Sequence, residues 1–339
     1  MTLDFVTKRA NNNFDLVRLT AAIAVAFSHS FSIFPANTIQ DPTKFFIKGD
    51  DAGTLSVYVF FFLSGIFITK SFVNSPSQLA FIINRLFRIW PALIVCIFMT
   101  VFIIGPVLTR LTLKAYFFDR GTWSYLINNC LIFNTKYYLP GVFELNRYQR
   151  AVNGSLWTLP LELTCYFVVL LIGSAIKYKI NIVSVVLLVI TLYSFNHLFL
   201  FLINKQSAVF IVGCIVYLVR KCIVIDYRIF IFIGLLLVVF NRSTYQAYVF
   251  YVFVLYGALV MGASSLLNKI NLPGDYSYGV YIYAFLLQQI ISYYQKNITP
   301  YEGFLLVLPF AFLFAALSWH FIEQPILKKA KVLISTKRV

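Results

Sequence analysis

Long runs of apolar residues recur along the whole chain and alternate with shorter polar connections. Most runs are about 20 residues long, the length at which a helix crosses about 30 Å of hydrocarbon. We therefore predict an all-α fold, a polytopic membrane helix bundle of about ten transmembrane helices. The expected spans are residues 14–34, 54–73, 89–108, 156–176, 180–200, 207–220, 228–241, 244–267, 276–295 and 303–323.

The polar connections are too short to form a separate soluble domain, so we predict a single membrane domain over residues 1–339. The first run is too long for the core of a signal peptide and has no small-residue cleavage site after it, so it should remain as a span. The long connection 109–155 contains the amphipathic segment TWSYLINNCLIFN, expected to lie on the membrane surface or dip into it. Residues 324–339 read as a short basic tail.

Basic residues fall mainly on alternate connections, which indicates the orientation. The richer connections hold Lys70, Arg85, Arg88, Lys177, Lys179, Arg220, Lys221, Arg228, Lys328, Lys329, Lys331, Lys337 and Arg338. The poorer ones hold Lys205, Arg242 and Lys296. The positive-inside rule then predicts that both termini are cytoplasmic.

Composition supports a membrane protein and removes two classes of function. The chain is 60% hydrophobic and 12% charged, with a mean hydropathy of +0.82. The net charge of +16 indicates loops that face anionic lipid, and no nucleic-acid partner is expected. The five cysteines form no CxxC pair and the three histidines lie on different runs, so we predict no metal site.

Three polar side chains interrupt the first apolar run, FDLVRLTAAIAVAFSHSF. Arg18 and His29 are eleven positions apart, which is three helical turns plus about 20°, so they share one face about 16 Å apart along the axis. Asp15 can form an i,i+3 pair with Arg18 and lower the cost of burying its charge. The alternatives are an Arg18 that snorkels to the interface and a His29 that is a satisfied packing residue.

The fourth span begins SLWTLPLEL and places a carboxylate, Glu162, about two turns inside its outer end. Its expected depth is close to that of His29, and an intramembrane carboxylate needs a partner. We therefore predict that Glu162 and His29 pair, which would orient the imidazole. Trp157 and Pro160 suit the start of this helix.

Arg85 and Arg88 lie at i and i+3 at the expected start of the third span, in NRLFRIWPAL. Two guanidinium groups beside a helix N-terminus make a phosphate site, although topology determinants would look the same. Other polar positions are expected to be structural. Gly65 should mark a close helix contact rather than a nucleophile site at Ser64, and Glu323 should be solvated or pair with a nearby lysine.

A cytoplasmic phosphate site and a His with a carboxylate near the outer face suit transfer of a group from a cytosolic donor to an acceptor hydroxyl. They also suit a glycolipid or polysaccharide transporter or flippase with a proton-coupled His and Glu. A structural or sensory membrane protein remains a third reading, which leaves Glu162 and His29 unexplained.

The ordered motifs decide between these readings. The opening FDLVRLTAAIAVAFSHSF, then FFLSGIFI, NRLFRIWPAL, SLWTLPLEL, SYGVYIYAF and FIEQP, resembles acyltransferase family 3, the membrane O-acyltransferases that include O-antigen and other surface-polysaccharide O-acetyltransferases. The resemblance covers nearly the whole chain. It implies an inner-membrane enzyme that moves acetyl from cytosolic acetyl-CoA to a hydroxyl of a lipid-linked oligosaccharide or surface glycan, such as lipopolysaccharide O-antigen.

The resemblance also implies roles for individual residues. His29 would be the general base or a transient acyl carrier, Glu162 would orient it, and Arg18 would stabilise negative charge. Arg85 and Arg88 would hold the phosphates of CoA. Many relatives have a second histidine where this chain has Ala284, so no second catalytic histidine is expected, nor is a fused SGNH-type domain.

Overall fold

The computed structural model describes residues 1–8, 12–34, 39–45, 50–132, 134–178 and 204–336. In these ranges the chain is helical, and the only β-type pairing is an isolated bridge between Thr2 and Val224. The helices are α1 (Leu3–Val6), α2 (Phe14–Ile33), α3 (Ala52–Asn74), α4 (Gln78–Met99), α5 (Gly105–Leu108), α6 (Leu113–Phe118), α7 (Arg120–Leu131), α8 (Thr158–Tyr178), α11 (Lys205–Leu218), α12 (Tyr227–Val239), α13 (Gln246–Gly262), α14 (Ser277–Tyr294), α15 (Pro300–Ser318) and α16 (Gln324–Thr336). Short 3₁₀ turns lie at η2 (Pro42–Phe45), η4 (Gly154–Trp157) and η5 (Leu267–Lys269), and π turns at η3 (Thr100–Ile104) and η6 (Trp319–Glu323).

Five helical runs in the described part of the chain are long and apolar enough to cross a membrane: Phe14–Ile33, Ala52–Asn74, Gln78–Leu108, Gly154–Lys177 and Pro300–Ile334. Three shorter apolar helices, Lys205–Leu218, Tyr227–Val239 and Gln246–Gly262, coincide with expected spans, as does α14. The expected span 180–200 lies outside the described residues, so the total of ten remains a prediction. The described part of the chain is therefore all-helical and carries five helical runs suited to crossing a membrane.

Two helical runs extend beyond the expected spans, because polar residues interrupt the apolar stretches from which the spans were predicted. The third run begins at Gln78 and not near residue 89, since Ser77 caps it by accepting a hydrogen bond from the Ala80 amide. The last run continues through η6 into α16, so the described part of the basic tail is helical. The predicted boundaries followed apolar residues, so they stopped at the first charged positions. The helix itself continues as far as its backbone hydrogen bonds do.

The described residues form two compact units, and each is described by itself. Unit 1 comprises Met1–Ala24, Thr43–Ser75 and Thr164–Asp275. In it, α11 and α13 pack against α3, and α12 packs against α13. Its apolar core includes Phe14, Phe62, Leu63, Ile66 and Leu259.

One end of unit 1 gathers the N-terminus and two basic connections. The Met1 ammonium donates to the Ile225 carbonyl at 3.1 Å, and Arg220 forms an ion pair with Asp4 at 2.6 Å. The Lys70 ammonium, at the end of α3, donates to the Thr7 carbonyl. Three segments predicted to share one membrane face therefore meet at one end of this unit.

Unit 1 also contains the closest helix approach at Gly65, as its motif predicted. A methyl group built on Gly65 would lie 2.2 Å from the Phe210 carbonyl oxygen of α11, and one on Gly213 would lie 2.2 Å from the Phe62 carbonyl oxygen of α3. The missing side chains let the two backbones touch, which increases packing contact where lipid offers no hydrophobic gain.

Unit 2 comprises Val25–Pro42, Pro76–Leu163 and Tyr276–Val339. In this unit α14 packs against α15, α4, and η4 at the start of α8, and α16 packs against α4. A small apolar cluster of Ala26, Phe34, Ala284, Val307 and Ala311 joins the end of α2 to α14 and α15. The resulting centre of unit 2 is α14.

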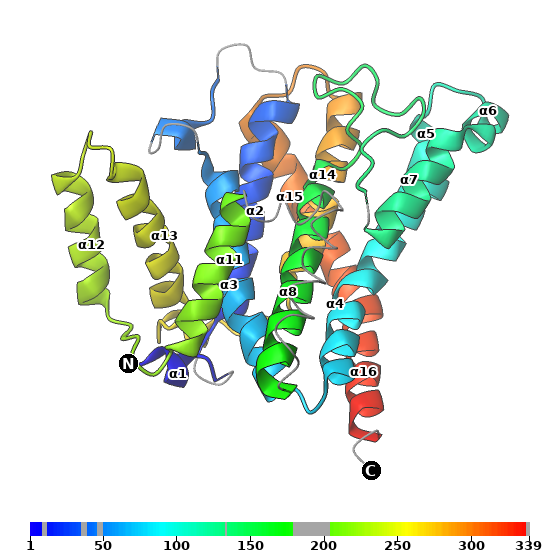
Figure 1. The fold of residues 1–339 in the computed structure, drawn as a ribbon. Coiled ribbons are helices and arrows are strands. Elements are labelled where there is room, and N and C mark those ends of the chain that lie inside the picture. The colour runs from blue at the N-terminus through cyan, green and yellow to red at the C-terminus, as the bar shows by residue number, and fades with distance from the viewer. Residues whose placement is uncertain (9–11, 35–38, 46–49, 133, 179–203, 337–339) are drawn as a thin grey trace. The chain divides into compact units, whose positions relative to one another are not determined.

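The amphipathic segment of the long connection forms α7, which runs back alongside α4 (Figure 1). Just before it, in α6, the Tyr116 hydroxyl donates to the Val101 carbonyl at 2.9 Å. Near the end of α7, the Trp90 indole donates to the Cys130 carbonyl at 2.9 Å. Val101 and Trp90 are eleven residues apart, so the segment from α6 to the end of α7 follows the membrane-spanning run for about 16 Å. Of the two expected placements, this geometry favours a segment that dips inward.

We predict that Gly65→Ala destabilises the protein by about 1–3 kcal/mol, because its methyl group forces α3 and α11 apart. Gly234→Ala is the matched control, since its methyl group would lie 3.3 Å from the nearest atom, in the side chain of Phe253. Both changes raise helix propensity, so only the contact differs. Thermal unfolding in detergent should show a lower midpoint for Gly65→Ala alone, and equal midpoints would contradict the close contact.

Candidate functional site

Arg18 and Asp15 form the ion pair that their spacing predicted. The Arg18 guanidinium lies 3.6 Å from the Asp15 carboxylate, and the two side chains are 23% and 43% exposed. The guanidinium also lies over the ring of Phe67 on α3, 4.9 Å from its centroid. Charge pairing and a cation–π contact together lower the cost of placing this arginine in an apolar run.

His29 lies on the unit 2 part of α2, in a turn whose polar neighbours are hydrogen-bonded. Its ring packs edge-on against Phe285 of α14, with centroids 5.1 Å apart. Ser28 donates to the Asp41 carboxylate at 2.7 Å. Ser30 accepts from the Gln288 amide of α14 at 2.8 Å. The backbone that carries His29 is therefore fixed on both sides of the imidazole.

Asp41 is a site residue that the sequence analysis did not name. It belongs to the loop after α2 and is only 5% exposed. Its bond to Ser28 brings a buried carboxylate within one residue of His29 along α2. Because the loop sequence QDPT is typical of any solvated turn, nothing in the pattern distinguished this aspartate.

Glu162 is the fifth residue of α8 and approaches α14 at Tyr278 and Tyr281. Its charge acts on both phenols, and the charges of Arg88 and Glu323 also act on Tyr278. Just before it on α8, the Thr158 hydroxyl is hydrogen-bonded to the Tyr281 hydroxyl at 2.8 Å. Tyr281 precedes Phe285, the residue beside His29, by one turn of α14. The pairing of Glu162 with His29 stays a prediction.

Arg88, which is 23% exposed, forms an ion pair with a buried glutamate. Its guanidinium lies 2.8 Å from the Glu323 carboxylate, and Glu323 is 1% exposed. The Ser318 hydroxyl donates to the same carboxylate at 3.0 Å, and the rings of Tyr278 and Trp319 lie 5.8 Å from the guanidinium carbon. The expectation that Glu323 is solvated or pairs with a lysine is therefore wrong. The partner is an arginine 235 positions away, which no local pattern could indicate.

The helix N-terminus does not contribute to a phosphate site at Arg85 and Arg88. Because α4 begins at Gln78, these arginines lie seven and ten residues after its first residue, about 10 and 15 Å along the axis. The favourable field of a helix end fades within the first turn. Arg85 lies over the ring of Phe81, one turn earlier, at 6.0 Å. Any anion held here must be held by side chains.

Amide side chains of α14 connect His29 to the outer loop. The Gln288 amide donates to the Ala26 carbonyl at 2.6 Å as well as to Ser30. The next residue, Gln289, donates to the carbonyls of Tyr148 and Ala151 at 2.8 and 2.6 Å. Both glutamines are fully buried. The helical turn with His29 and the loop before α8 are thus held by neighbouring residues of one helix.

Two further observations concern positions predicted to lack a role. Ala284 is buried in the small apolar cluster of unit 2 and points into packing. Within the described ranges, no three His, Cys, Asp or Glu side chains converge in a way that could hold a metal ion. His320, exposed on η6, is hydrogen-bonded to the Tyr276 hydroxyl at 3.0 Å.

Comparison with known proteins assigns the family. A family model described as an acyltransferase domain, that of acyltransferase family 3, matches residues 11–322. The chain belongs to acyltransferase family 3. It is therefore a membrane acyltransferase, and the match includes His29, Glu162 and all three arginines discussed above.

Two curated relatives agree with this assignment. An O-acetyl transferase of Shigella phage Sf6 is 26% identical over 343 aligned positions, covering 96% of this chain and 98% of the relative. Nodulation protein 10 of Rhizobium leguminosarum bv. viciae is 30% identical over 161 positions, covering 46% of this chain and 42% of the relative. No solved structure matches the chain.

We predict that Glu323→Gln lowers stability by about 1.5–3 kcal/mol, because the partly buried Arg88 charge loses its counter-ion and a charge-assisted hydrogen bond. Asp15→Asn makes the same chemical change in a pair that is far more exposed, and it should cost less than about 1 kcal/mol. The measurement is thermal unfolding in detergent or nanodiscs.

A double variant, Arg88→Gln with Glu323→Gln, tests the cause. Removing both charges should recover part of the loss, since two neutral amides can bond to each other. If the double variant is as unstable as the sum of the two single ones, the ion pair is not what Glu323 contributes.

Proposed function

We propose that the chain is an inner-membrane O-acetyltransferase that moves acetyl from cytosolic acetyl-CoA to a hydroxyl of a surface polysaccharide or of its lipid-linked precursor. The observation that carries the proposal is the phage O-acetyl transferase, which aligns over nearly the full length of both chains. Both termini would be cytoplasmic. The basic segments that meet at one end of unit 1 support this orientation.

His29 acts as the general base in this proposal. Its imidazole removes the proton of the acceptor hydroxyl while the hydroxyl oxygen attacks the thioester carbonyl carbon. The carbon–sulfur bond then breaks, and the CoA thiolate receives the proton from the imidazolium. Positioned proton transfer of this kind contributes roughly 10²–10⁴-fold to rate. The anchored turn around His29 supports the role, because a general base must be held in position.

Glu162 orients His29 and stabilises its imidazolium form. The approach of Glu162 to α14 one to two turns from Phe285 supports a shared polar region in unit 2. Arg18 stabilises negative charge that develops on the donor.

Arg85 and Arg88 bind the phosphates of acetyl-CoA, and Arg85 contributes more of the binding free energy. The Arg88 charge is already matched by Glu323, so its free energy of binding a further anion is smaller. Arg85, three residues earlier on α4, therefore makes the stronger charge-assisted hydrogen bond. The rings of Tyr278 and Trp319 lie beside the Arg88 guanidinium, with centroids 5.8 Å from its carbon.

The chemical role of His29 predicts that His29→Ala abolishes acetylation while the protein still reaches the membrane. The acetyl content of surface polysaccharide should be measured in cells with the wild-type gene, a deletion, His29→Ala, and His320→Ala as the matched control. We expect acetyl groups with the wild type and His320→Ala only. Acetylation that survives the deletion would refute the surface-glycan assignment, and acetylation retained in His29→Ala would refute the base.

Loss of a phosphate contact predicts a different kinetic signature for Arg85→Ala. A hydrogen bond to a charged group is worth about 1.5–3 kcal/mol, so the KM for acetyl-CoA should rise roughly tenfold to a hundredfold. The KM for the acceptor should not change. Arg228→Ala, which removes an exposed arginine from unit 1, is the control. A lower kcat with an unchanged KM for acetyl-CoA would contradict phosphate binding by Arg85.

A further inference from the structure

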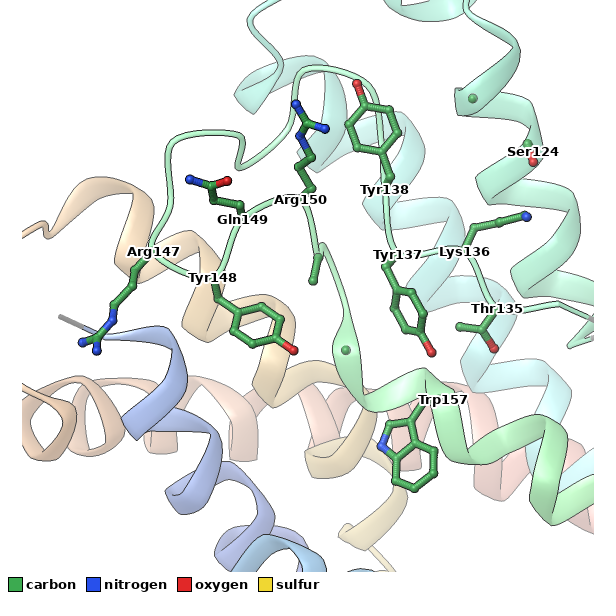
Figure 2. A pocket seen from close by; sticks show the side chains of 13 residues that line it. Ser124, Thr135, Lys136, Tyr137, Tyr138, Arg147, Tyr148, Gln149, Arg150 and Trp157 are labelled. Carbon is green, nitrogen blue, oxygen red and sulfur yellow. The ribbon is translucent and has the colours of Figure 1, made fainter. Parts of the chain in front are cut away.

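Unit 2 contains a cavity of about 870 Å³ that the reaction scheme above does not use (Figure 2). It lies between α7, the extended return of the long connection, and the start of α8. A volume in this range is typical of sites for small organic ligands. This connection is the one predicted to face the outside, where a glycan acceptor would arrive.

Aromatic side chains dominate the inner part of the cavity. Tyr137 and Tyr148 lie near each other on two segments of the connection, and Trp157 lies farther away, at η4 (Figure 2). Burial, and then the nearby Tyr148 phenol, raise the pKa of Tyr137. Tyr137 and Tyr148 are 39% and 43% exposed, so both rings are accessible to a ligand. Flat rings that also carry hydroxyl or indole donors can pack on the C–H faces of a pyranose and hydrogen-bond its hydroxyls.

The rim of the cavity is cationic. Lys136 and Arg150 line it, whereas Arg147 is drawn away by donating to the Phe34 carbonyl at 2.8 Å. No acidic side chain is among the described residues that line it. Rings and ammonium or guanidinium groups together favour a saccharide that carries a negative charge.

Arg150, at the rim, has an unfavourable backbone conformation that its contacts maintain. Its φ angle is +60°, in the left-handed region that an arginine rarely adopts. The Arg150 amide donates to the Phe143 carbonyl at 3.4 Å, and its guanidinium lies over the ring of Tyr138 at 5.9 Å. Strained residues that a fold retains cluster at ligand sites, and this one carries the charge that would meet the ligand.

The inner wall of the cavity leads to His29 through one aromatic ring. Tyr148 packs edge-on against Phe285 with centroids 5.8 Å apart, and Phe285 packs edge-on against His29 at 5.1 Å. Gly154 completes the wall, since a methyl group there would lie 2.5 Å from the Phe285 ring. A ligand packed on Tyr148 is therefore separated from the imidazole by two rings, Tyr148 and Phe285.

We propose that this cavity is the acceptor subsite, and that it takes an anionic saccharide that packs on Tyr137 and Tyr148 while its charge meets the cationic rim at Arg150. The charge can be a sugar carboxylate or a sugar phosphate. Calling the ligand an acceptor rests on the proposed acetyl transfer, whereas its binding to the cavity does not.

Binding is tested on the full chain in nanodiscs by isothermal titration calorimetry without acetyl-CoA. The probes are digalacturonic acid, glucose 1-phosphate and the neutral disaccharide maltose. We expect at least one anionic probe to bind ten times more tightly than maltose, and the better of the two identifies carboxylate or phosphate. No binding by either anionic probe, or equal binding of maltose, would overturn the proposal.

Single substitutions test whether the anionic probe binds in this cavity. Tyr148→Ala and Arg150→Gly should each weaken the anionic probe at least tenfold, and Arg150→Gly should be no less stable thermally because glycine tolerates its φ angle. Tyr245→Ala, at an exposed tyrosine of unit 1, and Arg242→Gly, at another arginine with a positive φ angle, make the same changes outside the cavity and should leave binding unaltered. Wild-type affinity in Tyr148→Ala and Arg150→Gly would overturn the assignment.

A second readout separates this proposal from acetyl transfer. With purified protein, acetyl-CoA and the native polysaccharide, Arg150→Gly should raise the KM for the acceptor about tenfold and leave the KM for acetyl-CoA unchanged. If the wild type binds the saccharide but transfers no acetyl group, the proposed reaction is refuted and the cavity remains a saccharide-binding site. If Arg150→Gly transfers acetyl with an unchanged KM for the acceptor, the cavity is not the acceptor subsite and the proposed reaction stands.

Discussion

Unit 2 depends on two adjacent buried amides, Gln288 and Gln289, in the middle of α14. Neighbouring residues of a helix point about 100° apart, so one amide reaches α2 and the other reaches the loop before α8. A buried amide that loses its partners costs about 1–3 kcal/mol, which makes both connections obligatory. Asn146 extends the network by donating to the Gln289 side chain at 2.8 Å, and Asn153 donates to the Ile282 carbonyl at 2.7 Å. Specific positions in an apolar bundle are thus set by amides, because apolar packing alone allows neighbouring helices to slide.

Charge is distributed differently in the two candidate binding regions. Near Arg85 and Arg88, the Arg88 charge is balanced internally by a fully buried glutamate, so the net charge left to attract an anion is smaller than the residue count suggests. Around the outer cavity, the cationic groups lie at the rim and the rings lie inside. Pairing with Glu323 holds the Arg88 guanidinium in one position. Cationic groups at the rim of the cavity attract a charged ligand before it packs against the rings.

Features that depend on neighbours in sequence could be predicted from the sequence. The apolar runs located most helices, the i,i+3 spacing identified the pair of Asp15 and Arg18, and the glycine in FFLSGIFI marked the contact of α3 with α11. The start of α4 was placed too late, because Asn84, Arg85 and Arg88 separate its apolar first turns from the long apolar run. Glu323, Asp41 and the two glutamines were missed for another reason. Their partners are set by tertiary packing, and a single sequence holds no information on which distant polar groups meet.

The excursion from Thr109 to Gly141 is closed at its base. The Thr109 hydroxyl donates to the Pro140 carbonyl at 2.8 Å, and the Arg110 amide donates to the Gly141 carbonyl at 3.1 Å. Gly141 itself has φ of +75° and crowds Thr109 too closely for a side chain. A segment clasped in this way can change its interior sequence or length without moving the helices on either side. The insert can thus be exchanged as one piece, while the turn that holds His29 and the segment with Tyr148 and Arg150 keep their positions.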